Sequence, residues 1–214
     1  MDNFKTAIIL AGGKSSRMGF DKQLLFINEK RLIYSIACNL EKHFEDIIII
    51  SNKIELYKDS KYKIISDEIK NMGPLSGISV GLNKSTSKYV YIVACDMPYI
   101  DYKYIEYMKS KIDKDIKQCI AYDMYISKID GRIELFHGFY KRDLGKEIKE
   151  YLLNSDRKSI ISFFERTNKK VKFIKDDEFN KYKFKKDMFI NLNTKEDLNL
   201  LKRDVEIYGE SKKV

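Results

Sequence analysis

The chain has 214 residues, of which 43% are hydrophobic and 13% aromatic, so it can bury the core of one domain. Only 2 prolines and 10 glycines are present, and no apolar run reaches the length of a spanning helix, which excludes collagen-like and helical membrane proteins. The net charge of +9 arises from 41 basic and 32 acidic residues interspersed along the chain, without a basic stripe of stacking aromatics. We therefore expect a lysine-rich surface, no nucleic-acid partner and no membrane partner.

The N-terminal half alternates apolar, β-branched runs with segments of helical spacing. The expected strands cover residues 6–10, 46–51, 63–66 and 89–94, and the expected helices cover residues 31–40 and 75–82. Near-continuous hydrophobicity of the strands fits a sheet covered on both faces, and the alternation predicts βαβ units. The sequence thus predicts an α/β, Rossmann-like fold with a mostly parallel sheet and helices on both faces. Loops after the strands then share one edge, where such sheets bind ligands.

The C-terminal half has a looser pattern. Helices are expected at 102–111, 144–153 and 160–164, and strands at 118–122, 132–140, 171–174 and 188–190. Thr194 is expected to cap a last helix that runs through Leu201, with Asp197 in a capping-box relation. We find no linker or repeat, so we expect a single domain over residues 1–208 and a flexible tail at 209–214.

Cysteines and the first residues bear on the cellular compartment. Cys38, Cys95 and Cys119 are odd in number and far apart, which favours reduced thiols over a disulfide framework or a zinc site. The apolar stretch before Gly12 is too short for a secretory signal. Both observations predict a cytoplasmic location.

The segment from Leu10 to Lys22, with the sequence LAGGKSSRMGFDK, leads from the first strand into a loop with three glycines and three cations. Glycines allow backbone N–H groups to converge on an anion, and Lys14, Arg17 and Lys22 can neutralise a polyphosphate. From glycine spacing alone, an ordinary strand-to-helix turn with solvated lysines is an equal alternative. Neither the Walker loop nor the dinucleotide-binding fingerprint is present.

This segment resembles the signature LAGGxSxRMGxDK of the molybdenum cofactor guanylyltransferase family, and every specified position matches. Further blocks follow in the family's order: Asp67, the sequence GPLSGI at 73–78, CDMP at 95–98 and FINLNTKEDL at 189–198. Lys195 departs from the commonest pattern, which has proline there. The resemblance spans most of the chain and rests on the joint occurrence of these blocks.

The resemblance implies a nucleotidyltransferase fold and the transfer of GMP from GTP to the phosphate of molybdenum-carrying molybdopterin, with release of pyrophosphate. It also implies transient contacts with proteins that deliver and accept the cofactor. A phosphate nucleophile is already ionised at neutral pH, so such a site aligns anions and neutralises charge without a general base. His43 and His137, the only two histidines, lie outside the motifs, and we interpret both as structural.

The matched blocks imply catalytic roles for Arg17, Lys22 and Asp96. Asp96 follows the fourth strand and is assigned to Mg²⁺, which accepts one carboxylate together with phosphate oxygens and water. For an isolated aspartate, a cap of the helix at 102–111 is the alternative.

The resemblance also assigns the binding of both substrates. The nucleotide-binding residues are Leu10, Ala11, Gly12, Gly13, Gly19, Lys22, Asn52, Asp67, Gly73, Gly77 and Asp96. The pterin-binding residues are Asn191 and Asn193, whose amides offer the donors and acceptors that a pterin needs. Local alternatives are an Asx turn at Asp67, helix punctuation by Gly73 and Gly77, and turn formation by the two asparagines.

Two other functions share these features. A molybdopterin cytidylyltransferase or a sugar-phosphate nucleotidyltransferase would keep both the glycine-rich loop and the metal-binding aspartate. A non-enzymatic basic binding protein would keep the fold, but it has no need of both Lys22 and Asp96. No physical rule identifies guanine from the sequence, so the base rests on the resemblance.

Overall fold

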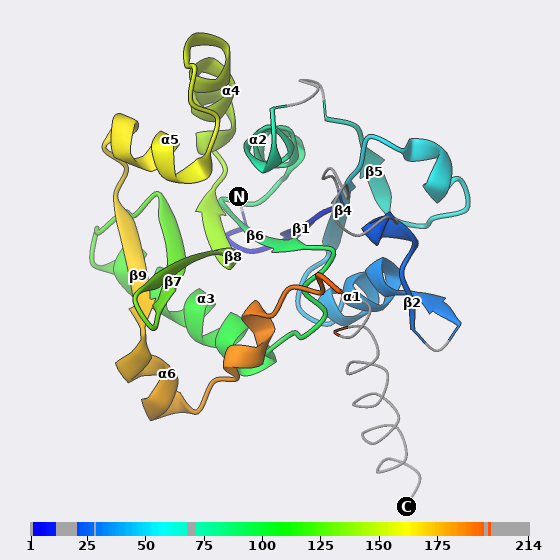
Figure 1. Ribbon diagram of the computed structural model, residues 1–214. Coiled ribbons are helices and arrows are strands. Elements are labelled where there is room, and N and C mark those ends of the chain that lie inside the picture. Colours follow the sequence, from blue (N-terminus) through cyan, green and yellow to red (C-terminus); the bar gives the residue numbers. More distant parts are fainter. Residues whose placement is uncertain (1, 12–20, 28, 68–71, 195–196, 198–214) are drawn as a thin grey trace, which may run out of the picture.

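A computed structural model describes residues 2–11, 21–27, 29–67, 72–194 and 197 of the chain. Its centre is a seven-stranded sheet in the order β5-β4-β1-β6-β8-β7-β9, seen nearly edge-on in Figure 1. The strands are β1 (Thr6–Leu10), β4 (Asp46–Ile50), β5 (Lys63–Ile65), β6 (Tyr89–Ala94), β7 (Met124–Ile129), β8 (Arg132–Lys141) and β9 (Val171–Lys175). A separate two-stranded pair joins β2 (Phe26–Ile27) to β3 (Lys30–Arg31).

The middle of the sheet is parallel, because β1 pairs in parallel with β4 and β6, and β4 with β5. β8 runs antiparallel to both β6 and β7, whereas β7 and β9 are parallel. β1 and β6 are buried at every position, as the continuous apolar runs predict. Strand order reverses at β1, so the carboxyl ends of β1 and β6 form the crevice where α/β sheets bind ligands.

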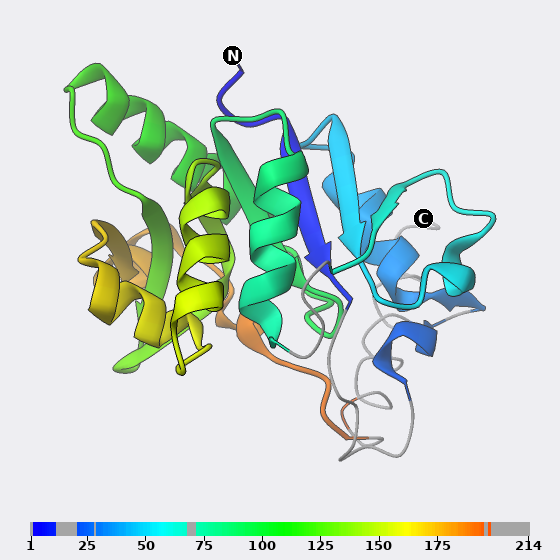
Figure 2. The ribbon, with the colours of Figure 1, turned by 90° about the horizontal axis from the view of Figure 1, so that it is seen from above.

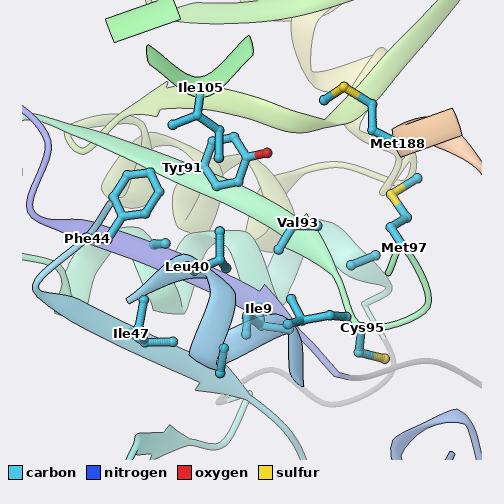
Figure 3. Packing of buried hydrophobic residues seen from close by; sticks show 14 of the residues in the cluster. Ile9, Leu40, Phe44, Ile47, Tyr91, Val93, Cys95, Met97, Ile105 and Met188 are labelled. Carbon is cyan, nitrogen blue, oxygen red and sulfur yellow. The ribbon is translucent and has the colours of Figure 1, made fainter. Parts of the chain in front are cut away.

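Helices cover both faces of the sheet (Figures 1 and 2). One face carries α1 (Leu32–Leu40), α3 (Tyr102–Lys117) and α6 (Asp176–Tyr182), and the other carries α2 (Pro74–Lys84), α4 (Leu144–Asn154) and α5 (Ile160–Thr167). Figure 3 shows the core between the sheet and the helices α1 and α3, in which Leu40 and Ile105 of the helices face Ile9 and Val93 of the sheet. Alternating side chains of the central strands therefore pack into two separate cores, one on each face of the sheet. The predicted α/β architecture is confirmed.

The helix expected at 102–111 extends to Lys117, so the strand predicted at 118–122 is wrong. Ile105, Met108 and Ile112 are buried at helical spacing and the pattern continues beyond residue 111, which keeps the helix regular. The chain then turns through Cys119, which has a left-handed φ of 59°, and β7 begins at Met124. The expected strand at 132–140 is confirmed and forms a hairpin with β7 through Asp130-Gly131, both with positive φ.

The strand predicted at 188–190 is also wrong, because residues 186–189 form the 3₁₀ helix η3 (Lys186–Phe189). The amide of Ile190 donates to the carbonyl of Asp187, and the side chain of Met188 is fully buried. The apolar run at 188–190 therefore packs into a hydrophobic core and does not join the sheet. Helix α6 was not expected, since only Phe179 is buried in a charged segment. Two further 3₁₀ helices are η1 (Lys22–Leu24) and η2 (Ile54–Tyr57).

The expected capping box at Thr194 is present. The hydroxyl of Thr194 accepts the amide of Asp197 at 3.0 Å, and the Asp197 carboxylate accepts the amide of Thr194 at 2.8 Å. Residues 198–214, which include Leu201 and the predicted tail, lie outside the described part. Within the described part, no helix is long and apolar enough to cross a membrane.

His137 is fully buried in β8, with a left-handed φ of 54°. The hydroxyl of Tyr91 and Nδ1 of His137 form a hydrogen bond of 2.7 Å, and burial holds the pKa of Tyr91 far above its ordinary value. Burial lowers the pKa of His137 to about 3. The imidazole is therefore neutral in the folded protein, which agrees with a structural role.

This burial makes stability depend on pH. The unfolded chain protonates His137 near pH 6.5, but the folded protein does so only near 3, so the unfolded state binds more protons below about pH 6.5. We expect His137 to reduce the free energy of unfolding by about 2 kcal/mol between about pH 7 and about pH 5. Urea unfolding of the wild type and His137→Asn at both pH values measures this, because asparagine tolerates the left-handed backbone.

The control is His43→Asn. His43 is partly buried beside Glu106, and its replacement leaves His137 in place, so the loss at low pH should persist. An equal loss in the wild type and in His137→Asn would contradict the assignment of the pH dependence to His137.

Candidate active site

The predicted site lies at the carboxyl ends of the parallel strands. Leu10 ends β1 and Ala11 follows it, and both are buried. The amide of Ala11 donates to the carbonyl of Ile50 at 2.9 Å, and the amide of Cys95 donates to Leu10 at 3.0 Å. These bonds continue the ladder past the strand ends, so Asp96 and the start of the glycine-rich loop emerge side by side.

Lys22 joins three segments that are distant in the sequence. Its Nζ lies 2.6 Å from Oδ2 of Asp96 and donates to Oδ1 of Asn193 at 2.9 Å. The amide of Leu192 also donates to the carbonyl of Asp96 at 2.9 Å, which holds the C-terminal segment against the end of β6. The side chains of Lys22 and Asp96 are 21% and 16% exposed, so the ion pair is partly shielded yet open to a ligand.

Asp21 and Lys53 support the turn that carries Lys22. The carboxylate of Asp21 caps η1 by accepting the amide of Gln23 at 3.0 Å, and its other oxygen lies 2.6 Å from Nζ of Lys53. Burial opposes ionisation of Asp21, but these hydrogen bonds outweigh it and lower its pKa. Asp21 therefore acts as an anionic cap and is already occupied by Lys53.

Asn52 and Asp67 form a second polar group at the same edge. Oδ1 of Asn52 accepts the amide of Asp67 at 3.0 Å and the hydroxyl of Ser66 at 3.2 Å. The hydroxyl of Ser76, in the first turn of α2, donates to the Asp67 carboxylate. The loops after β4 and β5 and the start of α2 are thereby fixed together. Binding of nucleotide by Asn52 and Asp67 stays a prediction.

Positions 73 and 77 require glycine for different structural reasons. Gly73 precedes α2 with a φ of +71°, which is strained for other residues, and Pro74 then occupies the first helical position. A Cβ at Gly77 would lie 3.2 Å from Leu10 and 3.3 Å from Ile50, so this glycine lets α2 pack closely on the sheet. Direct contact of either glycine with nucleotide stays a prediction.

The two asparagines predicted to bind the pterin belong to the C-terminal segment that lies against Asp96. Asn193 is exposed and bonded to Lys22, while Asn191 is half-buried. The amide of Asn193 donates to the Asp197 carboxylate at 2.8 Å, and this bond is the largest contribution that lowers the pKa of Asp197. The helix cap therefore holds this segment in place, and the side-chain oxygen of Asn193 faces Lys22.

Cys95 is buried directly before Asp96. Burial first, and then the adjacent carboxylate of Asp96, raises the pKa of the thiol to about 12. A buried thiol whose pKa is raised in this way is a poor nucleophile. Cys38, Cys95 and Cys119 are free cysteines in the structure, as expected.

Four predicted residues, Gly12, Gly13, Arg17 and Gly19, lie outside the residues that the structure describes. The structure brings Lys22, Asp96 and Asn193 together, and it places Leu10, Ala11, Asn52 and Asp67 along the same edge. The sequence analysis missed Gln23 and Ser76. Gln23 directly follows the first matched block and Ser76 lies within the block at 73–78, so their places in the sequence were the available signal.

Asp96 offers one carboxylate to a divalent cation. In the described ranges, no three His, Cys, Asp or Glu side chains are close enough together to hold a metal by themselves. Mg²⁺ usually keeps several waters and takes one or two carboxylates together with substrate phosphates. The residues present therefore fit a cation that arrives with a phosphorylated substrate, and they do not fit a permanent all-protein metal centre.

Comparisons with known proteins agree with this geometry. Residues 7–171 match the model of the MobA-like NTP transferase domain. A probable molybdenum cofactor guanylyltransferase of Peptoclostridium acidaminophilum is 44% identical over 91% of this chain and 87% of its own. A molybdenum cofactor guanylyltransferase of Syntrophotalea carbinolica is 38% identical over 94% of this chain and 91% of its own.

Among solved structures, molybdopterin-guanine dinucleotide biosynthesis protein A from Archaeoglobus fulgidus superposes with a TM-score of 0.75. The two chains are 22% identical, and the match covers 94% of this chain and 98% of the other. This likeness supports the nucleotidyltransferase fold. With matched blocks at one edge of the sheet and relatives aligned along nearly the whole chain, the protein belongs to the MobA-like nucleotidyltransferases and, within them, to the molybdenum cofactor guanylyltransferase family.

Proposed function

We propose that this protein transfers GMP from GTP to the phosphate of molybdopterin and releases pyrophosphate, forming the guanine dinucleotide cofactor. The observation that carries the proposal is the Lys22 ammonium, which contacts both Asp96 and Asn193. The family's nucleotide motif and its pterin motif thus meet at one cation. GTP and molybdopterin are the substrates that this assignment requires.

Chemistry at this site depends on charge and alignment. The attacking phosphate is already an anion, so no residue has to remove a proton from it. Lys22 can compensate the negative charge on the phosphates, while the ordered loops at Asn52 and Asn193 fix where the two substrates lie. Neutral Cys95 and buried His137 take no part in the transfer.

Nucleotidyltransferases typically need a divalent metal, and we propose Mg²⁺ for this protein. Asp96 would hold it, and the cation would neutralise phosphate charge and help to align the reacting groups. Binding of a nucleotide-bound cation by Asp96 would compete with the ion pair that Asp96 forms with Lys22. Three further expectations stay predictions: the cytoplasmic location, the end of the domain at residue 208, and transient contacts with proteins that deliver and accept the cofactor.

The direct test is to incubate the purified protein with molybdopterin, Mg²⁺ and radiolabelled GTP. We expect labelled GMP in the pterin dinucleotide and one pyrophosphate for each product molecule. A parallel incubation replaces molybdopterin with a sugar phosphate. Product in that reaction alone would favour the sugar-phosphate alternative.

Asp96→Asn should fold normally and lose GMP transfer at ordinary Mg²⁺ concentrations. The substitution preserves shape but removes the charge that attracts the cation, and the side chain lies near the surface. Initial rates over a Mg²⁺ titration measure the loss, with Asp59→Asn, an exposed aspartate, as the matched control. Near-wild-type turnover in Asp96→Asn would rule out Asp96 as the main metal ligand and make Asp67 the first candidate.

Lys22→Ala should weaken GTP binding or slow transfer about ten- to a hundredfold, because a charge-assisted hydrogen bond contributes roughly 1.5–3 kcal/mol. The matched control is Lys61→Ala, which removes a lysine whose only carboxylate partner in the described residues is Glu41, at the surface. Calorimetric GTP affinity and steady-state rates measure both variants. Equal effects would show that a diffuse positive field, and not a specific contact, binds the triphosphate.

Base preference separates the guanylyltransferase from the cytidylyltransferase alternative. A tenfold difference in affinity corresponds to about 1.4 kcal/mol of extra stabilisation at saturation. With Mg²⁺ present, GTP should therefore raise the unfolding temperature more than CTP, ATP or dTTP. A larger shift with CTP would transfer the assignment to the cytidylyltransferase.

A further inference from the structure

Gln23 follows Lys22 directly in η1 and is buried, with 5% of its surface exposed. It lies next to the matched block, and none of the expected site roles includes it. Its surroundings are polar, which is unusual for a side chain so deeply buried in a short 3₁₀ turn.

The side-chain carbonyl of Gln23 accepts two buried hydroxyl donors. Ser51 Oγ lies 2.5 Å and Tyr57 Oη 3.0 Å from Oε1. Ser51 Oγ already accepts the amide of Lys53 at 3.0 Å, so its own proton is left for Gln23. Burial raises the pKa of Tyr57 above its ordinary value, so the phenol stays protonated and acts as a donor.

The backbone of Gln23 is held as firmly. Its amide donates to Asp21 Oδ1 at 3.0 Å, and its carbonyl accepts Nη2 of Arg31 at 2.8 Å and Nε at 3.2 Å. Arg31 is in turn fixed by the carbonyl of Leu56 at 2.6 Å and lies 4.6 Å from the ring centre of Tyr57. The amide, carbonyl and side-chain oxygen of this one residue are thus all bonded, which leaves the turn little freedom to rotate.

This anchor connects the two polar groups of the site. On one side Lys22 precedes Gln23 and reaches Asp96. On the other side Ser51 precedes Asn52, whose side chain accepts the amide of Asp67. A hydrogen bond between Gln23 and Ser51 therefore sets the spacing between the phosphate-binding lysine and the loop expected to hold the nucleoside.

We propose that Gln23 is a positioning residue for the transfer reaction: by binding Ser51 and Tyr57 it fixes the direction of the Lys22 ammonium relative to Asn52. The inference rests on the proposed function and adds a residue to it. Gln23 touches neither substrate and acts only through Lys22. Small misplacements of an aligning group are sufficient to slow a transfer reaction strongly.

The test is a double-mutant cycle of Gln23→Met and Lys22→Ala. Methionine keeps the length of the side chain and removes the acceptor. In the wild-type background, Gln23→Met should slow GMP transfer about tenfold or more and weaken Mg²⁺-GTP binding. In the Lys22→Ala background the same change should have less than about a twofold effect on either quantity, because the group it positions is absent.

Gln118→Met is the matched control, since Gln118 is the other glutamine of the chain and is exposed beyond α3. It should leave both rate and affinity unchanged. If Gln23→Met has no effect, or if its loss is equally large without Lys22, the proposal is wrong. The affinity arm uses GTP without pterin, so it decides the role of Gln23 even if GMP transfer to molybdopterin is not found.

Tyr57→Phe covers the case in which Gln23→Met does not fold, because methionine leaves two buried hydroxyls without an acceptor. Phenylalanine keeps the ring beneath Arg31 and removes one of the two donors to Gln23. We expect a smaller loss of the same kind, again abolished by Lys22→Ala. A loss in Tyr57→Phe that persists in the Lys22→Ala background would equally overturn the proposal.

Discussion

The carboxyl ends of β1, β4, β5 and β6 must lie at one edge of the sheet, and the site depends on this constraint. Parallel pairing brings together Ala11, Asn52, Asp67 and Asp96, which are far apart in the sequence. The C-terminal segment then adds Asn193 from outside the sheet, bound through Leu192 to the backbone of Asp96. The sheet supplies most of the residues predicted to bind the nucleotide, and the returning chain supplies those predicted to bind the pterin.

The Lys22–Asp96 ion pair joins the two charged groups at the centre of this arrangement. Without it, the structure would hold two partly buried charges of opposite sign, each without compensation, in a narrow region. Under the proposed function, phosphate would replace Asp96 as the partner of Lys22, and the metal would replace Lys22 as the partner of Asp96. Because Lys22 also binds Asn193, a change of partner at Lys22 would alter the hydrogen bonding of Asn193 as well.

The sequence predicted the buried strands and most helices because their apolar periodicity is strong and local. It failed at residues 118–122 and 188–190, where short apolar runs pack differently from what their length suggests: the first follows an extended α3, and Met188 fills a core. Asp96 and Lys22 were recognised from matched blocks, and the structure brings them into contact. Gln23 was not predictable, because its role arises from Ser51 and Tyr57, which approach it only after β4 and η2 have formed.

The ends of the sheet limit how the folded protein meets other chains. Its inner strands include the run Ile47–Ile50, which would readily pair with another extended segment if it were exposed. The two outermost strands are β5, only three residues long, and β9, which carries Lys172 and Lys175 among its five residues. Short length and positive charge both hinder the addition of a further strand. The strongly aggregation-prone sequence at the centre is thereby enclosed between edges that resist intermolecular β-sheet growth.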